Sequence, residues 1–184
     1  MDTIFLIGFP TCGKTTLGRE LARLLGREFI DLDERVEHQA GMRVSDIFAT
    51  HGEAAFRQME RECLLEVAHS HAIVAVGGGT PCHADNIDLM NAAGTTVWLT
   101  TPVETLINRL QRPEYKRPRP AVASLTDGQI ARYVNRTYRA RLPYYTQAKI
   151  HFDATDIETA ADTRRTATRL ARLIHPHTPA NKSQ

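Results

Sequence analysis

The sequence has little that would direct the chain to a membrane, a nucleic acid or an oxidising compartment. It has no apolar run near the roughly 20 residues that a bilayer-spanning helix needs. The formal charge is only +2 over 184 residues, which indicates no general attraction to nucleic acid or anionic lipid. Its three cysteines lack CxxC spacing and are odd in number, so we expect no disulfide framework. The N-terminal MDTIFLIG lacks a charged n-region, so we expect no signal peptide and a cytoplasmic protein.

What the composition does offer is the profile of a globular protein, with 42% hydrophobic and 24% charged residues. A chain of this length fits one domain, which we expect to span residues 1–175, with a disordered polar tail at 176–184. Positive charge is concentrated from Arg109 to Arg141, a segment that contains nine basic and only two acidic residues. Such a local field suits a small anionic ligand.

Short apolar runs alternate with stretches of helical periodicity along the chain. This alternation predicts an α/β fold in which a parallel sheet is covered on both faces and ligands bind beyond the carboxyl ends of the strands. The expected strands are Thr3–Ile7, Phe29–Leu32, Ala72–Val76, Thr95–Leu99 and Lys149–Phe152. The expected helices are 14–26, 53–69, 85–93, 103–110, 127–141 and 158–174. RPEYKRPRP (112–120) contains three prolines, and we expect it to be an exposed loop, neither helix nor central strand.

GFPTCGKT, residues 8–15, matches the phosphate-loop pattern G-x-x-x-x-G-K-[ST] between an expected strand and an expected helix. In such a loop the backbone N–H groups and the helix N-terminus face the phosphates. Lys14 is expected to reach the β- and γ-phosphates, and the Thr15 hydroxyl to ligate Mg²⁺. Thr16 is expected in the first helical turn. Cys12 fits a tight loop without a catalytic role, and we expect thiol reagents to inactivate the protein at Cys12 or, failing that, at Cys82.

An acceptor side is indicated by residues after the second and third expected strands. Asp31 and Asp33, two apart on a strand, are expected to point the same way; one can hold a metal-bound water and the other can accept a proton from a substrate hydroxyl. The alternative is that Asp33 caps a helix. The three glycines of VGGGTPC (76–82) let a ligand approach the backbone.

Two arginines complete the expected acceptor side. Arg57 lies three residues before Glu60, which is either a solvated ion pair or an arginine oriented at the edge of a cleft. Helical spacing puts Arg141 on the inward face of its helix, where a guanidinium needs an anionic partner. Because arginine pairs favour carboxylates, these residues predict a small acid whose hydroxyl accepts the γ-phosphoryl group.

In their order along the chain, these motifs resemble shikimate kinase. The segments that carry the resemblance are GFPTCGKTT, FIDLDERVE, SDIFATHGEAAFRQME, VGGGTPC, Arg117–Pro118 and RLPYY at 141–145. The resemblance implies a P-loop nucleoside-monophosphate-kinase-like three-layer fold with a five-stranded parallel sheet, an acceptor-binding region at about 33–61 and a mobile lid at about 112–125. It also implies Mg²⁺-dependent transfer from ATP to the 3-hydroxyl of shikimate in chorismate and aromatic amino acid biosynthesis, by what we expect to be a monomer.

The resemblance also assigns roles to individual residues. Lys14, Asp33 and Arg117 would be catalytic, with Asp33 as base or orienter and Arg117 entering from the lid. Nucleotide contacts would come from Thr11, Cys12, Gly13, Lys14, Thr15, Thr16, Arg109 and Arg117, with Arg109 against the adenine. Shikimate would contact Asp33, Arg57, Gly78, Gly79 and Arg141, with Phe48 and Phe56 walling its pocket. Mg²⁺ would be held by Thr15 and, through water, by Asp31.

The sequence departs from the family pattern at three places. Thr11 stands where glycine is usual, so the loop carries a backbone cost or takes another path. The lid has RPRP instead of RP followed by aliphatic residues. The segment DATDIE, residues 153–158, has no arginine on the expected adenine side.

Other functions remain open from the residues alone. The first rival function is that of another small-molecule P-loop kinase of the same superfamily, such as a gluconate or nucleoside-monophosphate kinase. A nucleotide-binding regulator without transferase activity would keep the phosphate loop but need no acceptor residues. Metal binding by histidine is a poorer hypothesis, because the eight histidines show no ligand spacing.

Overall fold

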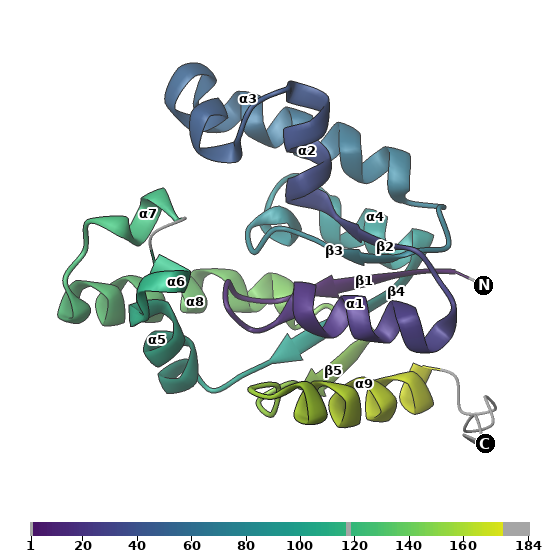
Figure 1. The fold of residues 1–184 in the computed structure, drawn as a ribbon. Coiled ribbons are helices and arrows are strands. Elements are labelled where there is room, and N and C mark those ends of the chain that lie inside the picture. Colours follow the sequence, from purple (N-terminus) through teal and green to yellow (C-terminus); the bar gives the residue numbers. More distant parts are fainter. Residues whose placement is uncertain (1, 117–118, 175–184) are drawn as a thin grey trace.

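A five-stranded parallel sheet forms the centre of the protein, which is described here by a computed structural model covering residues 2–116 and 119–174. The strand order is β2-β3-β1-β4-β5, and Figure 1 shows helices on both sides of the sheet. The strands are β1 (Thr3–Ile7), β2 (Phe29–Asp31), β3 (Ile73–Ala75), β4 (Gly94–Thr100) and β5 (Ile150–Asp153). The predicted fold class is therefore confirmed.

The helices cover the two faces of this sheet and extend beyond its carboxyl edge. They are α1 (Lys14–Leu25), α2 (Leu32–Ala40), α3 (Val44–Val67), α4 (Asn86–Ala93), α5 (Val103–Gln111), α6 (Pro113–Lys116), α7 (Pro120–Ala123), α8 (Asp127–Tyr145) and α9 (Ala160–Ile174), with a 3-10 turn η1 (Thr80–Cys82). Helices α1 and α9 pack on each other, and Figure 1 shows α1 in front of the sheet and α4 behind it.

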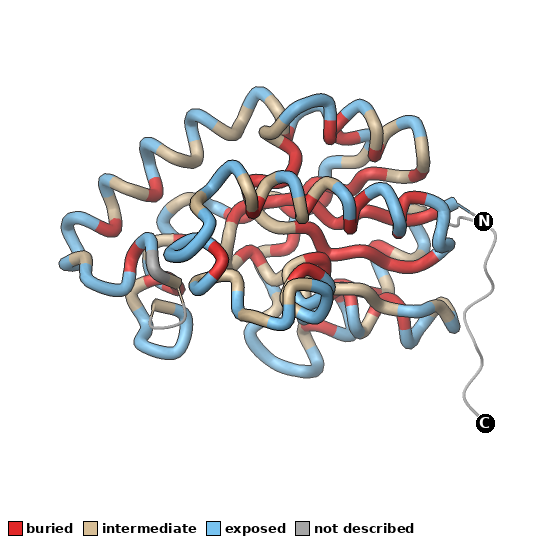
Figure 2. The backbone as a smooth tube through the Cα atoms, turned by 90° about the horizontal axis from the view of Figure 1, so that it is seen from above, coloured by how far each residue is buried: buried red, intermediate tan, exposed pale blue. Residues whose placement is uncertain are grey.

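The core follows the strands. All five residues of β1 are buried, because this strand has β3 on one side and β4 on the other and helices over both faces. A strand buried on both faces needs a continuous apolar run without polar alternation, which TIFLI provides. Figure 2 accordingly shows the buried segments concentrated in the sheet and in the inner faces of the helices.

Several helices differ from the sequence-based expectation. The segment 112–120 was expected to lack helix, yet α6 and α7 begin at Pro113 and Pro120. Proline is well tolerated in the first helical turn, where its missing N–H has no partner in any case, so the prolines start these short helices instead of preventing them.

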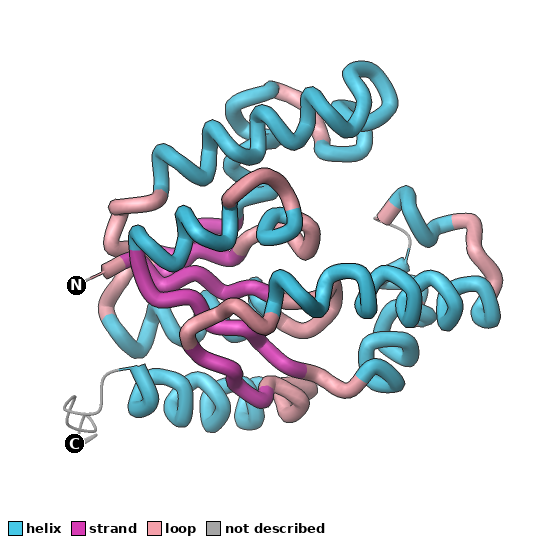
Figure 3. Tube along the Cα trace, turned by 180° about the vertical axis from the view of Figure 1, so that it is seen from behind, coloured by secondary structure: helices cyan, strands magenta, loops and turns pink. Residues whose placement is uncertain are grey.

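The region after β2 also differs. Helix α2 was not predicted, and it is Asp31, not Asp33, that caps it, by accepting a hydrogen bond from the Asp33 N–H at 3.1 Å. Helix α3 begins at Val44 and bends at Gly52, whose φ of 79° lies outside helical values. Figure 3 shows this pair of helices standing beyond the sheet edge, on the same side as the helices of the 113–123 segment.

Two expectations fall on parts of the chain that the structure does not describe. Arg117 and the tail at 176–184 both lie outside the described residues. Within residues 2–116 and 119–174, no helix combines the length and the apolar character needed to cross a membrane.

The tight pairing of β1 and β4 yields a stability test at Gly94. A Cβ there would lie 2.0 Å from the Thr3 carbonyl oxygen, so Gly94→Ala must separate the two strands. We expect it to lower the free energy of unfolding by about 2–3 kcal/mol in urea titrations.

Gly128→Ala is the matched control, because no atom lies within 4 Å of its Cβ position. In this exposed first turn of α8, alanine should be neutral or stabilising by up to about 1 kcal/mol. Equal unfolding midpoints for the two variants would contradict the steric argument.

Candidate active site

The phosphate loop joins the end of β1 to the start of α1, and its backbone is held in unusual conformations. Gly13 has a φ of 95° and Thr11 a φ of 69°, the left-handed region that favours glycine. The backbone cost expected from threonine at position 11 is therefore present. The Lys14 ammonium donates to the Gly8 carbonyl at 2.9 Å and the Phe9 carbonyl at 3.2 Å, which fixes it over the loop.

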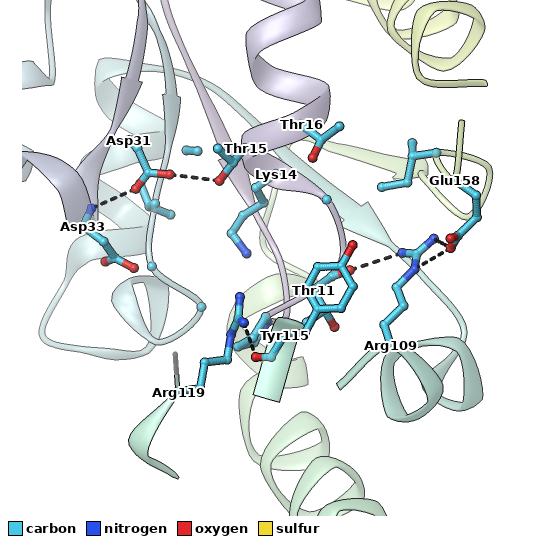
Figure 4. Close-up of a pocket in the computed structure, with 17 residues that line it drawn as sticks. Thr11, Lys14, Thr15, Thr16, Asp31, Asp33, Arg109, Tyr115, Arg119 and Glu158 are labelled. Carbon is cyan, nitrogen blue, oxygen red and sulfur yellow. Dashed lines mark hydrogen bonds and ion pairs between the residues drawn. The ribbon is translucent and has the colours of Figure 1, made fainter. Parts of the chain in front are cut away.

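A cavity of about 350 Å³ lies beyond the carboxyl ends of the strands (Figure 4). The predicted residues that line it are Thr11, Gly13, Lys14, Thr15, Thr16, Asp31, Asp33, Gly78 and Arg109. The carboxyl end of β1 and those of its neighbours thus supply one continuous surface, as the parallel topology requires.

Cys12 does not belong to that surface. Its side chain is 1% exposed and lies under the loop, with Sγ 2.9 Å from the position of a Cβ on Gly8. Alkylation of Cys12 therefore requires the loop to open. Cys82 is only partly buried and lies near Arg57 and Arg141, whose charges lower the pKa of its thiol while the larger effect of burial raises it.

The Thr15 hydroxyl and the Asp31 carboxylate form an oxygen pair at the start of α1. Thr15 Oγ1 donates to Asp31 Oδ2 at 2.9 Å, and the other oxygen of Asp31 caps α2. Mg²⁺ takes oxygen ligands, is usually held in proteins by one or two carboxylates and keeps several waters. These two residues fit that role, although no cluster of three or more acidic, histidine or cysteine ligands occurs among the described residues.

Asp33 lies in the first turn of α2 instead of on the strand, yet it reaches the same cavity as Asp31. Burial raises its pKa to about 6, and the charges of Asp31 and Glu60 add to this, while those of Lys14 and Arg57 oppose it. A carboxylate with a pKa in this range can accept a proton near neutral pH. The two aspartates thus line the same cavity, but Asp31 ends a strand and Asp33 begins a helix, whereas both were expected on the strand.

The three glycines after β3 each leave space for a different polar side chain. A Cβ on Gly77 would lie 2.8 Å from Glu60 Oε1 and 2.9 Å from Asp33 Oδ1. On Gly78 it would lie 3.0 Å from Arg141 Nη1, and on Gly79 2.8 Å from Arg57 Nη2. The predicted acceptor residues therefore gather around this loop, and any side chain on it would displace one of them.

Glu60 orients Arg57. The Glu60 side chain is fully buried and accepts from Arg57 Nη1 at 2.8 Å, and its other oxygen accepts from the Thr80 hydroxyl. A buried carboxylate is tolerated when it is paired and hydrogen-bonded in this way. Of the two interpretations of this pair, the oriented arginine is the one that the structure shows.

Arg141 points inward, as predicted from helical spacing. Its guanidinium lies 5.7 Å from the Phe9 ring centroid, and its Nη1 is buried without a hydrogen-bond partner among the described residues. Since an unmade hydrogen bond of a buried charged group is costly, this nitrogen is suited to an anionic ligand.

The rings of Phe48 and Phe56 pack against each other with their centroids 4.6 Å apart. Neither is among the described residues that line the cavity, so the structure does not bring them to it as pocket walls.

Arg109 is fixed at the opposite end of the cavity. It is 4% exposed, pairs with Glu158 at 2.7 Å and donates to the carbonyls of Thr11 and Thr155 at 3.2 and 3.0 Å. Its polar atoms thus tie the phosphate loop to the segment after β5. The hydrogen bond from Arg109 holds the pKa of Glu158 below its usual value.

Some functional positions were missed from the sequence. Tyr115, Arg119, Ile157 and Glu158 line the cavity, and the Tyr145 hydroxyl donates to the Gly78 carbonyl at 2.5 Å. Tyr145 belongs to the RLPYY motif, which could have identified it. The other four lie in segments for which the sequence indicates only loops or prolines, and only the tertiary fold brings them to the cavity.

The phosphate loop after the central strand and the raised-pKa carboxylate of Asp33 line one cavity, and the Arg141 guanidinium lies beside Gly78, which lines it too. Together these groups define a P-loop phosphotransferase for a small acidic acceptor. A family model described as shikimate kinase matches residues 10–172. The chain therefore belongs to the shikimate kinase family, and it is an ATP-dependent kinase.

Individual relatives agree with this assignment. The chain is 41% identical to a shikimate kinase of Parabacteroides distasonis over 95% of its own length and 100% of that protein. Its fold matches a crystal structure of shikimate kinase from Bacteroides thetaiotaomicron with a TM-score of 0.88 at 36% identity, covering 94% of this chain and 98% of that one. A shikimate kinase from Acinetobacter baumannii in complex with shikimate matches with a TM-score of 0.79 at 34% identity, covering 98% and 96% of the two chains.

The raised pKa of Asp33 predicts a pH dependence of both activity and stability. Because the carboxylate must be ionised to accept a proton, kcat/KM should fall about tenfold per pH unit below about pH 6. Asp33→Asn should abolish this limb together with nearly all activity, as measured in a buffer series from pH 4.5 to 8.

The same substitution should stabilise the free protein. A folded-state pKa above the unfolded value means that ionisation disfavours folding; this cost is absent below about pH 4, grows as pH rises and is complete above about pH 6. Asp33→Asn should therefore raise stability at pH 7.5 by about 1–3 kcal/mol, with the gain shrinking towards pH 4. A gain independent of pH, or one shared by the exposed control Asp88→Asn, would contradict the assignment.

Proposed function

We propose that Asp33 and Lys14 face each other across the reacting centre of a Mg²⁺-dependent transfer of the ATP γ-phosphoryl group to the 3-hydroxyl of shikimate. The observation that carries this proposal is Arg141 Nη1, which is buried without a hydrogen-bond partner among the described residues and lies beside Gly78. Gly78 in turn lines the cavity together with Asp33. A kinase of small acids needs both a proton acceptor and a carboxylate-binding cation. Asp33 in the cavity and Arg141 beside Gly78 would supply these two groups.

At the acceptor end, Arg57 and Arg141 would bind the shikimate carboxylate from either side of the Gly78–Gly79 backbone. Their guanidinium nitrogens flank those two glycines, and planar arginines favour bidentate carboxylate contacts. Asp33 would then accept hydrogen bonds from the ring hydroxyls.

At the nucleotide end, the phosphate loop from Thr11 to Thr16 would bind the phosphates through its backbone N–H groups and the N-terminus of α1. The adenine would lie on the face of Arg109, which Glu158 and two carbonyls hold in place. Thr15 and Asp31 would hold Mg²⁺, which when bound neutralises phosphate charge.

The chemistry asked of the protein is positioning, charge neutralisation and one proton transfer. The acceptor hydroxyl oxygen bonds to the γ-phosphorus as its proton passes to Asp33, and the bond from the γ-phosphorus to the bridging oxygen breaks, releasing ADP. Lys14 neutralises charge on the phosphates. Arg117, outside the described residues, is proposed to assist from the 112–125 segment.

We further propose that residues 1–175 act as one domain, as a monomer in the cytoplasm, with the acceptor region at 33–61. The single five-stranded sheet supports the assignment of one domain. Gluconate and nucleoside-monophosphate kinase activities are not favoured, because the family match is to shikimate kinase.

The direct test of the proposal is ADP formation with and without shikimate. We expect ADP release from MgATP to depend on shikimate and on Mg²⁺, with little release when gluconate or a nucleoside monophosphate replaces it. A coupled spectrophotometric assay measures this. Mg²⁺-dependent nucleotide binding without shikimate-stimulated ADP release would identify a regulator instead of a kinase.

Arginine variants test the assigned roles. Arg141→Ala should raise the KM for shikimate by about 10–100-fold with a smaller effect on kcat, because it removes ground-state binding of the carboxylate. Arg117→Ala should show the reverse, a fall in kcat with little change in that KM. Arg132→Ala, exposed on the outer side of α8, is the control and should leave both constants unchanged. If Arg141→Ala instead lowered kcat and Arg117→Ala raised the KM for shikimate, the roles assigned to these two arginines would be contradicted.

A further inference from the structure

The glycine loop after β3, residues Gly77–Gly79, is hydrogen-bonded through its carbonyl groups only. The carbonyls of Gly77 and Gly79 accept from backbone N–H groups of the following turn η1, at 3.1 and 2.9 Å. The Gly78 carbonyl accepts from the Tyr145 hydroxyl at 2.5 Å. None of the three glycine N–H groups has a hydrogen-bond partner among the described residues. The loop therefore keeps three unused donors at a place where Gly77 and Gly78 line the cavity.

Tyr145 reaches this loop from the end of α8. It follows Arg141 by four residues, so the two side chains are neighbours on one face of the helix. The side chain of Tyr145 is fully buried, and its ring centroid lies 6.0 Å from that of Trp98, so the ring is packed in the core. Burial raises the pKa of the hydroxyl, and the charge of Arg141 acts in the opposite direction. The hydroxyl is therefore a protonated donor at neutral pH.

The bond from Tyr145 fixes the peptide group between Gly78 and Gly79. No cis peptide bond occurs among the described residues, and in a trans peptide the C=O and the following N–H point in opposite directions. Because the Gly78 carbonyl is directed at a side chain in the core, the Gly79 N–H is directed away from the core. The guanidinium groups of Arg141 and Arg57 flank these two glycines, so an anion held by them would lie within reach of this N–H.

This peptide group would turn over easily without such a bond. A peptide turns over through ψ of the residue before it and φ of the residue after it, and here both residues are glycine, which restricts neither angle. A turned peptide would present the Gly78 carbonyl to a bound anion instead of the Gly79 N–H, replacing an attraction by a repulsion. The Tyr145 hydroxyl opposes the rotation, because it can donate only to a carbonyl that faces the core.

We propose that Tyr145 is a positioning residue for acceptor binding, whose hydroxyl holds the Gly78–Gly79 peptide so that the Gly79 N–H donates to the carboxylate of the acceptor. The inference rests on the proposed function and deepens it, because it assigns to Tyr145 a role in the affinity for the acid and none in the transfer of the phosphoryl group. Tyr145 is not among the described residues that line the cavity, so it acts through the backbone without touching the acceptor.

The first test is Tyr145→Phe, which removes only the hydroxyl. We expect the calorimetric Kd and the KM for shikimate to rise about tenfold, the usual effect of losing a hydrogen bond to a charged group. The kcat should change less than about threefold and the Kd for ATP less than about twofold, because the role is confined to acceptor binding. Tyr144→Phe, the same change one residue earlier in α8, is the control and should leave all of these constants unchanged.

Two further measurements separate positioning from a loss of stability. Tyr145→Phe removes a buried hydrogen bond and should also lower the free energy of unfolding. Gly94→Ala, expected to destabilise the fold at the start of β4, should leave the Kd for shikimate unchanged. In ¹H–¹⁵N NMR spectra of the wild-type protein, shikimate should move the Gly79 amide resonance downfield, as a new hydrogen bond does, and this shift should be smaller in Tyr145→Phe.

A Kd for shikimate within about twofold of wild type in a folded Tyr145→Phe would overturn the proposal. An equal weakening of ATP binding, or an equal effect of Gly94→Ala, would also overturn it, because either would identify a general loosening of the fold. In all of these cases shikimate-dependent ADP release by the wild-type protein would leave the proposed function standing. A wild-type protein without that release would overturn both, so the two failures are distinguishable.

Discussion

Five strands that all run in the same direction bring their carboxyl ends to one edge of the sheet, and the site depends on this alignment. With β1 between β3 and β4, the phosphate loop after β1 is adjacent to the glycine loop after β3. Asp31 ends β2, on the far side of β3, and still reaches the same cavity. Nucleotide and acceptor residues that lie more than 60 positions apart thus meet without any long excursion of the chain.

The acceptor half of that edge is organised from beneath by Glu60. This carboxylate is fully buried and bonds to Arg57 and Thr80, so it links α3 to the turn after the three glycines. Its charge also contributes to the raised pKa of Asp33. One buried group therefore sets the direction of a binding arginine and the proton affinity of the proposed base. An apolar residue of equal volume at this position would fill the space but would neither hold Arg57 nor raise the pKa of Asp33.

Most of the sheet and many of the residues around the site could be predicted from the sequence, because both are marked by local sequence patterns. Apolar runs mark buried strands, and the phosphate-loop glycines and Lys14 have fixed spacing. Helix α2 was missed because Leu32 and Val36 alone give it an apolar face, and α6 because proline was taken only as a helix breaker. Arg119 and Glu158 lie in two segments that the sequence analysis singled out, RPRP and DATDIE, but neither residue was identified as part of the site. Their place in the site arises from tertiary packing of two loops, which local patterns do not encode.

Thr11 has a consequence for how binding free energy is divided. Its left-handed backbone, φ 69°, costs a non-glycine residue about 1–2 kcal/mol, and the Arg109 hydrogen bond to its carbonyl at 3.2 Å helps to hold it there. A threonine samples fewer conformations than a glycine, so the empty loop is already close to its phosphate-binding shape. Less conformational entropy is then lost when a nucleotide arrives. Threonine at this position therefore lowers the stability of the fold but pre-organises the anion site. In a loop with glycine here, the corresponding entropic cost would arise only when the nucleotide binds.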